Sequence, residues 1–378
     1  MKRIKGVRPN QIPEDILSNP ELARWMELVP KNYNFEIHKT LWRIRELNAK
    51  RVGLQFPEGL QMYGCLLSDI LLAIGGLEDV IILADVVYGA CCIEDLTANE
   101  LHLDLLVHYG HSCLIPINET CMKTLYVFVD IAINIDTLVD TLIHNFPDTN
   151  EKIALVSTVQ FVESVTIAKK MLDERGYTNF NIPQAKPRTT GELLGCTSPA
   201  IPEQIIISVS DGRFHLEAAM IQNPGSKFFR YDPYQNKIYA EYYDLNEMKV
   251  RRNVSIEATR NARHIGLVLG TLGRQGSIHI LSQLEKLLQG IGRKYTVFLM
   301  SDVSQSSINK YPEVDAWVEI ACPRLAIDWG AEFTKPMLNP YECFVAFKNL
   351  PLDYPMDNYM YNGGEWSVYT SKEIETKS

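Results

Sequence analysis

The chain has 378 residues, of which 46% are hydrophobic and 22% charged, and a formal net charge of −9. At ~150 residues per domain this length favours two or three domains, and the composition is that of a folded globular protein. The acidic balance and the lack of a long basic run argue against nucleic acid as a partner. The basic start lacks the apolar middle of a signal peptide, and no apolar stretch approaches the ~20 residues of a membrane span. We therefore expect a cytoplasmic protein without a membrane partner.

Short apolar runs that alternate with helical patterns begin near residue 50. Uninterrupted apolar runs of this length are typical of buried parallel strands. After the first run, helical spacing is shown by Leu60, Tyr63, Leu67 and Leu71. In chain order, strands are predicted at 51–56, 80–84, 105–109 and 125–129.

The same alternation continues twice more along the chain. The second cycle has predicted strands at 153–157 and 204–209 around a helix near 162–171, and the third has strands at 265–270, 295–299 and 316–320 with a helix near 280–287. Such alternation predicts an α/β protein with three similar domains built on parallel sheets. The expected divisions are a surface segment at 1–40, domains at 41–148, 149–262 and 263–350, and a C-terminal tail at 351–378.

Each predicted α/β unit contains a cysteine beside small or turn-forming residues just beyond a strand-like run. These are Cys91, Cys196 and Cys322, about one domain length apart. Open α/β sheets bind ligands beyond the carboxyl ends of their strands, so three such ends at a common centre would form a metal site with one open position. Long separations have little motif value, however, and the residues alone favour buried structural cysteines. Cys65 and Cys121 are expected to be small core residues.

A second possible metal site is the run from His108 to Cys113. His108, His111 and Cys113 are side-chain types that bind zinc. Successive strand residues alternate between the two faces of a sheet, so the two histidines need not converge. Zinc therefore remains an alternative.

Two further segments follow predicted strands and precede predicted helices. The glycine-rich run 270–276 is similar to a phosphate loop but lacks its Lys-Ser/Thr ending, which leaves a carboxylate ligand or a plain tight turn. In the run 211–215, Asp211 is expected to cap the next helix, while Arg213 and His215 are candidates to reach a ligand.

Taken in order, six motifs resemble those of one family, the diphthamide-biosynthesis 2-(3-amino-3-carboxypropyl)histidine synthases, and in particular their eukaryotic subunit 1. The resemblance covers roughly residues 30–350, and a series of motifs is more specific than any one of them. The motifs are Gln55-Phe56-Pro57-Glu58-Gly59-Leu60, the segment from Asp85 to Cys91, His108-Tyr109-Gly110-His111-Ser112-Cys113, Asp211-Gly212-Arg213-Phe214-His215, the segment from Gly270 to Gly276, and Ala321-Cys322-Pro323-Arg324.

The resemblance implies that Cys91, Cys196 and Cys322, each from a different domain, bind a 4Fe-4S cluster with one open iron. Cys92 is a less favoured ligand, because the Gly-Ala-Cys pattern ends at Cys91. It further implies that S-adenosylmethionine binds the open iron and is cleaved to a 3-amino-3-carboxypropyl radical, which attacks C2 of a histidine in translation elongation factor 2 and leaves methylthioadenosine.

Several expectations about the cofactor contacts and partners follow from the same resemblance. Gly273, Arg274 and Gln275 are the candidate contacts to S-adenosylmethionine. The expected partners are a second, paralogous subunit 2 in a heterodimer, or another copy in a homodimer, together with an electron-donor protein and the elongation factor. A noncatalytic scaffold subunit is the other possibility within this family, although the complete cysteine set favours a catalytic one.

Overall fold

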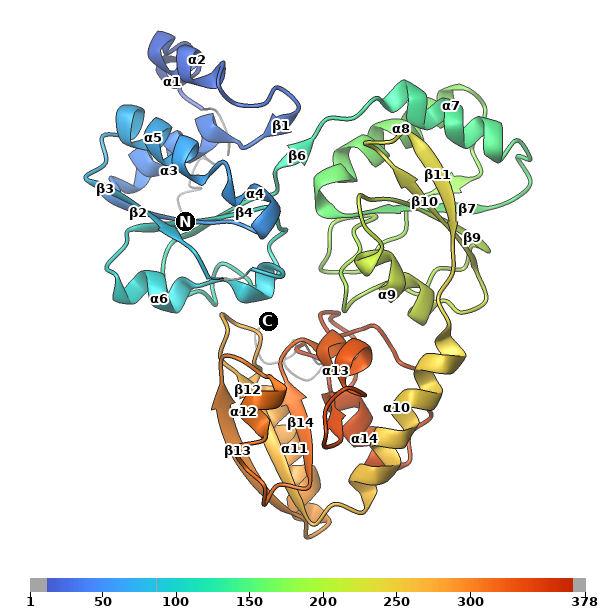
Figure 1. Cartoon of the computed structure of the whole chain (residues 1–378). Helices are drawn as coiled ribbons and strands as arrows, with labels where there is room; N and C mark the ends of the chain where they lie inside the picture. The colour runs from blue at the N-terminus through green and yellow to red at the C-terminus, as the bar shows by residue number, and fades with distance from the viewer. Residues whose placement is uncertain (1–11, 86, 370–378) are drawn as a thin grey trace, which may run out of the picture. The chain divides into compact units, whose positions relative to one another are not determined.

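Parallel strands form the centre of three sheets in the computed structural model, which describes residues 12–85 and 87–369. Contacts between residues divide the chain into two units, Met1–Ala132 and Ile133–Ser378, called unit 1 and unit 2 below. The α/β class with several parallel sheets is therefore confirmed (Figure 1). The expected domain boundaries near residues 148 and 262 stay predictions.

Unit 1 contains a four-stranded parallel sheet in the order β3-β2-β4-β5. Its helices α3 and α5 lie on one face and α6 on the other (Figure 1). The elements are α1 (Glu14–Leu17), α2 (Pro20–Met26), β1 (Tyr33–Asn34), α3 (Ile37–Leu47), β2 (Arg51–Gln55), α4 (Glu58–Gln61), α5 (Gly64–Gly75), β3 (Asp79–Leu83), the 3-10 turn η1 (Ala90–Cys92), α6 (Asp95–Glu100), β4 (Leu105–Tyr109), β5 (Thr124–Val127) and β6 (Asp130–Ile131).

The core of unit 1 includes the segment that was expected to lie on the surface. Helix α3 buries Ile37, Leu41 and Ile44, which recur one turn apart on a single face. Ile16 and Leu22, from α1 and α2, are buried in the same apolar cluster. Residues 12–40 therefore contribute side chains to the core. The sequence did not indicate this, because helices as short as α1 and α2 show no long periodic pattern even though each buries an apolar residue.

Unit 2 begins with a five-stranded sheet in the order β11-β10-β9-β7-β8. The pairs within β10-β9-β7-β8 are parallel, whereas β11 pairs antiparallel with β10, a hairpin edge that the expectation of parallel sheets did not include. The elements are α7 (Ile135–Asn145), β7 (Ile153–Ser157), the 3-10 turn η2 (Val159–Phe161), α8 (Val162–Glu174), β8 (Phe180–Asn181), β9 (Ile205–Val209), α9 (Phe214–Gln222), β10 (Lys227–Asp232) and β11 (Lys237–Glu241).

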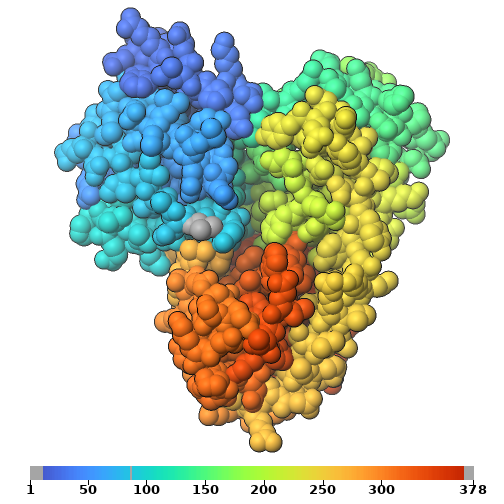
Figure 2. All heavy atoms as spheres, viewed as in Figure 1, coloured from blue at the N-terminus to red at the C-terminus, as the bar shows by residue number. Residues whose placement is uncertain are grey.

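Helix α10 (Leu245–Arg260) connects this sheet to the third, which is parallel and has the order β13-β12-β14-β15. On the surface, α10 runs beside the orange and red C-terminal part of the chain (Figure 2). The remaining elements are β12 (His264–Gly270), α11 (Ile278–Gly290), β13 (Lys294–Met300), α12 (Gln305–Ile308), β14 (Ala316–Ile320), α13 (Pro323–Trp329), β15 (Met337–Leu338) and α14 (Pro340–Lys348).

A buried ion pair joins α10 to helix α14, which follows the third sheet. The Arg252 guanidinium donates from Nε to Glu342 Oε1 at 2.7 Å and from Nη2 to Glu342 Oε2 at 2.8 Å, and Tyr354 donates its hydroxyl to the same carboxylate at 2.7 Å. All three side chains are buried. Because Tyr354 belongs to the segment expected as a surface tail, part of that tail is built into the core of unit 2.

In both the first and the third sheet, an aspartate accepts two backbone hydrogen bonds at the start of a strand. Asp104 accepts hydrogen bonds from the backbone nitrogens of Lys50 and Arg51 at the start of β2, at 2.7 and 2.9 Å. Asp315 does the same for Arg263 and His264 at the start of β12, at 2.8 and 2.9 Å. The repeated bond supports the similarity of these α/β units, which no repeat of sequence had shown.

Among the residues that the structure describes, no helix has both the length and the apolar character needed to cross a membrane.

Candidate functional site

Two of the three predicted cluster cysteines come together within unit 2. Cys322 follows β14 and occupies the position just before α13, whose first residue is Pro323. Cys196 lies in a tight turn in which the Thr197 nitrogen donates to the Leu194 carbonyl at 3.3 Å. Cys196 and Pro323, the residue after Cys322, line the same small cavity, and Cys196 contributes to the raised pKa of Cys322. Unit 2 therefore brings together two thiols that are 126 residues apart in the sequence.

Arg324 joins the segments that carry these two cysteines. Its Nη1 donates to the carbonyls of Gly195 at 3.2 Å and Phe214 at 2.9 Å, and its Nη2 donates to Glu217 at 2.6 Å. Its Nε donates to both carboxylate oxygens of Asp328, at 2.9 and 3.0 Å. The guanidinium is 3% exposed. Arg324 thus fixes the neighbour of Cys196 against the helix that follows Cys322.

The Phe214 ring explains why glycine precedes Cys196. The guanidinium carbon of Arg324 lies 4.3 Å from the centre of this ring. A Cβ atom at Gly195 would lie 2.1 Å from the ring, so any larger residue would displace it. The sequence runs 194–197, 211–215 and 321–324 therefore meet at one place.

Burial raises the pKa of both thiols. For Cys196 the pKa is raised by loss of solvation, and Arg188 and Arg324 offset part of this effect. For Cys322 the pKa is raised first by burial and then by Cys196 and Glu319. A metal would have to displace the thiol protons, since only the thiolate is a metal ligand.

Glu319, on β14, is a buried carboxyl that the sequence analysis did not single out. It is 0% exposed. Burial raises its pKa well above the usual range, and Glu342 adds to the effect. Burial thus disfavours the charged form of this carboxyl.

Cys91 belongs to unit 1 and lies in the turn η1. It is partly exposed, whereas Cys92 is fully buried. The accessible thiol of the pair is thus the one that the Gly-Ala-Cys pattern indicated. Within residues 12–85 and 87–369, no group of three or more His, Cys, Asp and Glu side chains is arranged to hold a metal ion. The set Cys91, Cys196 and Cys322 stays a prediction.

The alternative zinc site is only partly assembled in unit 1. His108 and His111 are brought together, with Nε2 of the first 3.1 Å from Nδ1 of the second. The Cys113 thiol instead donates to the Ile115 carbonyl at 3.3 Å. The other nitrogen of His108, Nδ1, lies 2.8 Å from Gln55 Oε1.

The glycine-rich run 270–276 is a tight loop next to the strand end that carries Cys322. A Cβ atom at Gly270 would lie 2.7 Å from Ala321, and one at Gly276 would lie 2.3 Å from the Gly270 carbonyl oxygen. Gly273 has a φ of +54°, which favours glycine. Helix α11 begins two residues after Gly276, so the loop does not lead directly into the helix. The roles of Gly273, Arg274 and Gln275 stay predictions.

Three expectations from the sequence were wrong. Asp211 does not cap α9, whose capping position is Arg213, because the helix begins later than the motif suggested. Cys65 and Cys121 are exposed, not core residues. Cys65 lies on the outer side of α5, which turns Leu67, Ile70 and Leu71 inward.

The other residues of the 211–215 run have structural partners. Arg213 donates to Glu217 at 2.9 Å and to the Tyr242 carbonyl at 2.8 Å. His215 contacts the edge of the Phe214 ring, and burial, together with Arg324, lowers the pKa of His215 to about 4. His215 is therefore neutral at physiological pH.

The C-terminal segment supports Cys196, a contact that sequence reasoning missed. The Tyr359 nitrogen donates to Thr197 Oγ1 at 3.1 Å, and the Ser198 nitrogen donates to the Met356 carbonyl at 2.8 Å. Cys196 lines a small cavity with Tyr354 and Asn358. The run Tyr354-Pro355-Met356-Asp357 gives no local sign of this contact, because Cys196 lies far away in the sequence.

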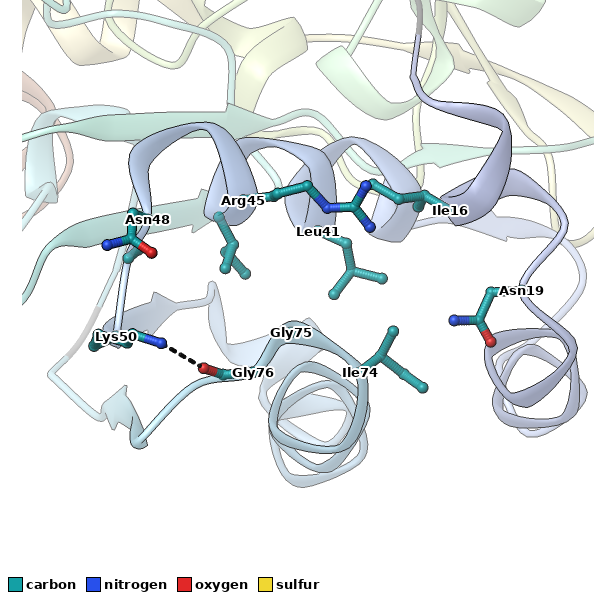
Figure 3. Close-up of a pocket in the computed structure, with 11 residues that line it drawn as sticks. Ile16, Asn19, Leu41, Arg45, Asn48, Lys50, Ile74, Gly75 and Gly76 are labelled. Carbon is teal, nitrogen blue, oxygen red and sulfur yellow. Dashed lines mark hydrogen bonds between the residues drawn. The ribbon is translucent and has the colours of Figure 1, made fainter.

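A larger pocket in unit 1 is a weaker candidate for a site. It has a volume of about 210 Å³ and is lined by residues of α3, α5 and the N-terminal segment (Figure 3). Its cations have structural partners, because Lys50 donates to the Gly76 carbonyl at 3.3 Å and Arg45 pairs with Asp15 at 2.7 Å. Both α3 and α5 end here, and the partial negative charge of helix C-termini accounts for these cations.

Comparison with known proteins gives consistent matches. Residues 56–357 match the family model described as putative diphthamide synthesis protein. The chain is 49% identical over 377 residues to 2-(3-amino-3-carboxypropyl)histidine synthase subunit 1 of Schizosaccharomyces pombe, covering 97% of this chain and 86% of the relative. It is 46% identical over 371 residues to the Homo sapiens protein of the same name, covering 96% and 84%.

The fold is also similar to that of a solved structure. Dph2 from Pyrococcus horikoshii, described with a 4Fe-4S cluster, has a TM-score of 0.73 and 24% identity, covering 86% of this chain and 94% of that one. At this identity the likeness concerns the fold. The family match and the subunit 1 relatives together show that this chain belongs to the diphthamide synthesis protein family.

Proposed function

We propose that this protein is the catalytic subunit for the first step of diphthamide biosynthesis, a transferase acting in the cytoplasm. It would transfer the 3-amino-3-carboxypropyl group of S-adenosylmethionine to C2 of a histidine imidazole in translation elongation factor 2, releasing methylthioadenosine. The observation that carries the proposal is the convergence of Cys196 and Cys322 in a chain whose relatives are named as subunit 1 of this synthase.

The residues present fit an iron-sulfur cluster. Cys196 and Cys322 supply soft sulfur ligands at the ends of two α/β segments, and Cys91 is the proposed third ligand. When bound, the cluster would supply the electron that cleaves a sulfur–carbon bond of S-adenosylmethionine. The Pyrococcus horikoshii relative of similar fold is described with such a cluster, which supports this choice over zinc.

The protein's own residues would hold the reactants in place. Arg324 fixes the Gly195–Cys196 turn, and the segment around Met356 and Tyr359 covers it from another side. Precise holding of reacting atoms lowers a barrier by several kcal/mol, so small displacements at this turn would be costly. The loop 270–276 adjoins Ala321 and is the proposed contact region for S-adenosylmethionine.

The test is anaerobic reconstitution of the chain with subunit 2, iron, sulfide, a reductant, labelled S-adenosylmethionine and elongation factor 2. We expect methylthioadenosine and a labelled histidine as products. Replacing Cys91, Cys196 or Cys322 by Ala should lower iron content and turnover, whereas Cys65→Ala on the exposed side of α5 should change neither.

Three results would contradict the proposal. Full iron content and turnover in all three ligand variants would contradict the assignment of the cluster ligands. 5′-Deoxyadenosine as the main product would contradict the proposed cleavage of the bond that releases methylthioadenosine. Normal turnover of the complex with all three cysteines replaced would indicate the noncatalytic role. Size-exclusion chromatography of coexpressed subunits should give one mixed species, since stable interfaces commonly bury over ~2,000 Å².

A further inference from the structure

Unit 1 contains a buried chain of hydrogen bonds to which the proposed reaction assigns no role. Gln55 ends β2 and lies directly opposite His108 in the neighbouring parallel strand β4. Both side chains are 0% exposed. The chain of bonds runs from the turn that carries Cys91, through Gln55 and His108, to His111. Gln55 and the histidines belong to two of the family-like motifs.

The backbone partners fix which way the Gln55 amide points. The Glu94 backbone nitrogen lies 3.2 Å from Gln55 Oε1, and a backbone N–H can only donate. Gln55 Nε2 lies 2.9 Å from the Cys92 carbonyl, which can only accept. The amide therefore binds the main chain on both sides of Ile93, immediately after Cys91 and Cys92. If the amide were reversed, its NH2 group would face the Glu94 N–H, so two donors would meet. Its oxygen would face the Cys92 carbonyl, so two acceptors would meet.

The amide orientation in turn fixes the proton positions on both histidines. Gln55 Oε1 lies 2.8 Å from His108 Nδ1, so Nδ1 must carry the hydrogen. His108 is neutral, since burial and then the neighbouring His111 lower its pKa well below the usual range. Its Nε2 is therefore an acceptor, and His111 Nδ1, 3.1 Å away, must donate to it. The neutral form of His111 then carries its lone pair on Nε2.

We propose that Gln55 is a positioning residue that clamps the turn carrying Cys91 to the strand pair β2–β4 and fixes the tautomers of His108 and His111. Buried networks whose members are all satisfied select a single arrangement, and residues behind a metal ligand commonly determine its orientation. The clamp itself is independent of any cofactor. Its consequence for a cluster ligand rests on the proposed function.

The experiment uses the full chain without cofactor and compares Gln55→Glu, Gln55→Leu and a matched control, Gln61→Leu. Gln61 is an exposed glutamine at the end of α4. The first readout is the rate at which iodoacetamide alkylates Cys92, followed by mass spectrometry. The exposed Cys65 and Cys121 serve as internal standards. Gln55→Leu should accelerate Cys92 alkylation about 10-fold or more, because two backbone bonds holding the turn are lost.

The Gln55→Glu variant tests the clamp on the turn separately from the tautomer of His108. In its ionised form the glutamate still accepts from His108 Nδ1 and from the Glu94 nitrogen, but it cannot donate to the Cys92 carbonyl, so alkylation is measured at alkaline pH, where the carboxyl is ionised. We therefore expect faster Cys92 alkylation with the His108 tautomer unchanged. The tautomer is read from ring nitrogen NMR of ¹⁵N-histidine protein, with His108→Gln to assign the signals.

Either of two results would overturn the proposal. The first is Cys92 alkylation in Gln55→Glu at the rate of the Gln61→Leu control, and the second is a His108 signal with the hydrogen on Nε2 in the unmodified chain. If Gln55→Leu does not fold, Gln55→Glu alone decides the first point. After reconstitution, a changed electron paramagnetic resonance spectrum in Gln55→Glu would show that the clamp also influences the cluster. Failure of the unmodified chain to bind iron would count against the proposed function only.

Discussion

Replacing Arg324 by Met should be among the most damaging single changes in unit 2. The substitution keeps much of the side-chain volume but removes five hydrogen bonds, to two carbonyls and to the carboxylates of Glu217 and Asp328. Removing one partner of a buried ion pair typically costs about 3–5 kcal/mol. The two carboxylates are 18% and 22% exposed, so water can solvate them in part and the lower end of that range applies.

The measurement is urea unfolding of the full chain followed by tryptophan fluorescence, alongside iron content after reconstitution. We expect the unfolding free energy to fall by about 3 kcal/mol and iron content to drop, because the Gly195 carbonyl beside Cys196 is released. Arg324→Lys should recover less than half of the loss, since one ammonium cannot reach all of these acceptors.

Arg251→Met is the matched control. Arg251 forms an exposed ion pair with Glu247 on α10, and its loss should change the unfolding free energy by less than about 0.5 kcal/mol. If Arg324→Met were no more destabilising than this control and kept its iron, the argument that Arg324 joins the two cysteine segments would be refuted.

Three further predictions concern other residues of unit 2. Gly195→Ala should destabilise unit 2 by about 1–3 kcal/mol by overpacking against Phe214, and adding Phe214→Leu should recover part of it in a double-mutant cycle. Because His215 stays neutral in the folded protein down to a pKa of about 4, the unfolded state takes up a proton first, and the unfolding free energy should fall by about 2 kcal/mol between pH 7 and 5. His215→Gln should remove this part of the slope, and an unchanged slope would contradict the pKa. Asp315→Ala should cost about 1 kcal/mol in urea unfolding through loss of two backbone hydrogen bonds, whereas no change would show that water replaces them.

The sequence by itself was enough to locate most strands and the cysteines that follow them. Segments such as Leu105–Tyr109, Ile153–Ser157 and Ala316–Ile320 were predicted with the bounds that the structure has. A strand buried on both faces needs an uninterrupted apolar run, and that is a local property of the chain. The resemblance of the motifs also identified the family, which the comparisons confirmed.

Only the tertiary structure decided which of these local features meet. The bond from Arg324 to the Gly195 carbonyl spans 129 residues, and that from Tyr359 to Thr197 spans 162. Nothing local to either residue specifies such a partner, because the pairing depends on how strands are ordered within the sheets of unit 2. The same reason explains the errors at Cys65 and Cys121, since exposure depends on which side of an element faces the core. The sequence gives the residue types within each segment, and these largely decide whether it forms a helix or a strand. Contacts between distant segments form only when the sheets and helices pack together.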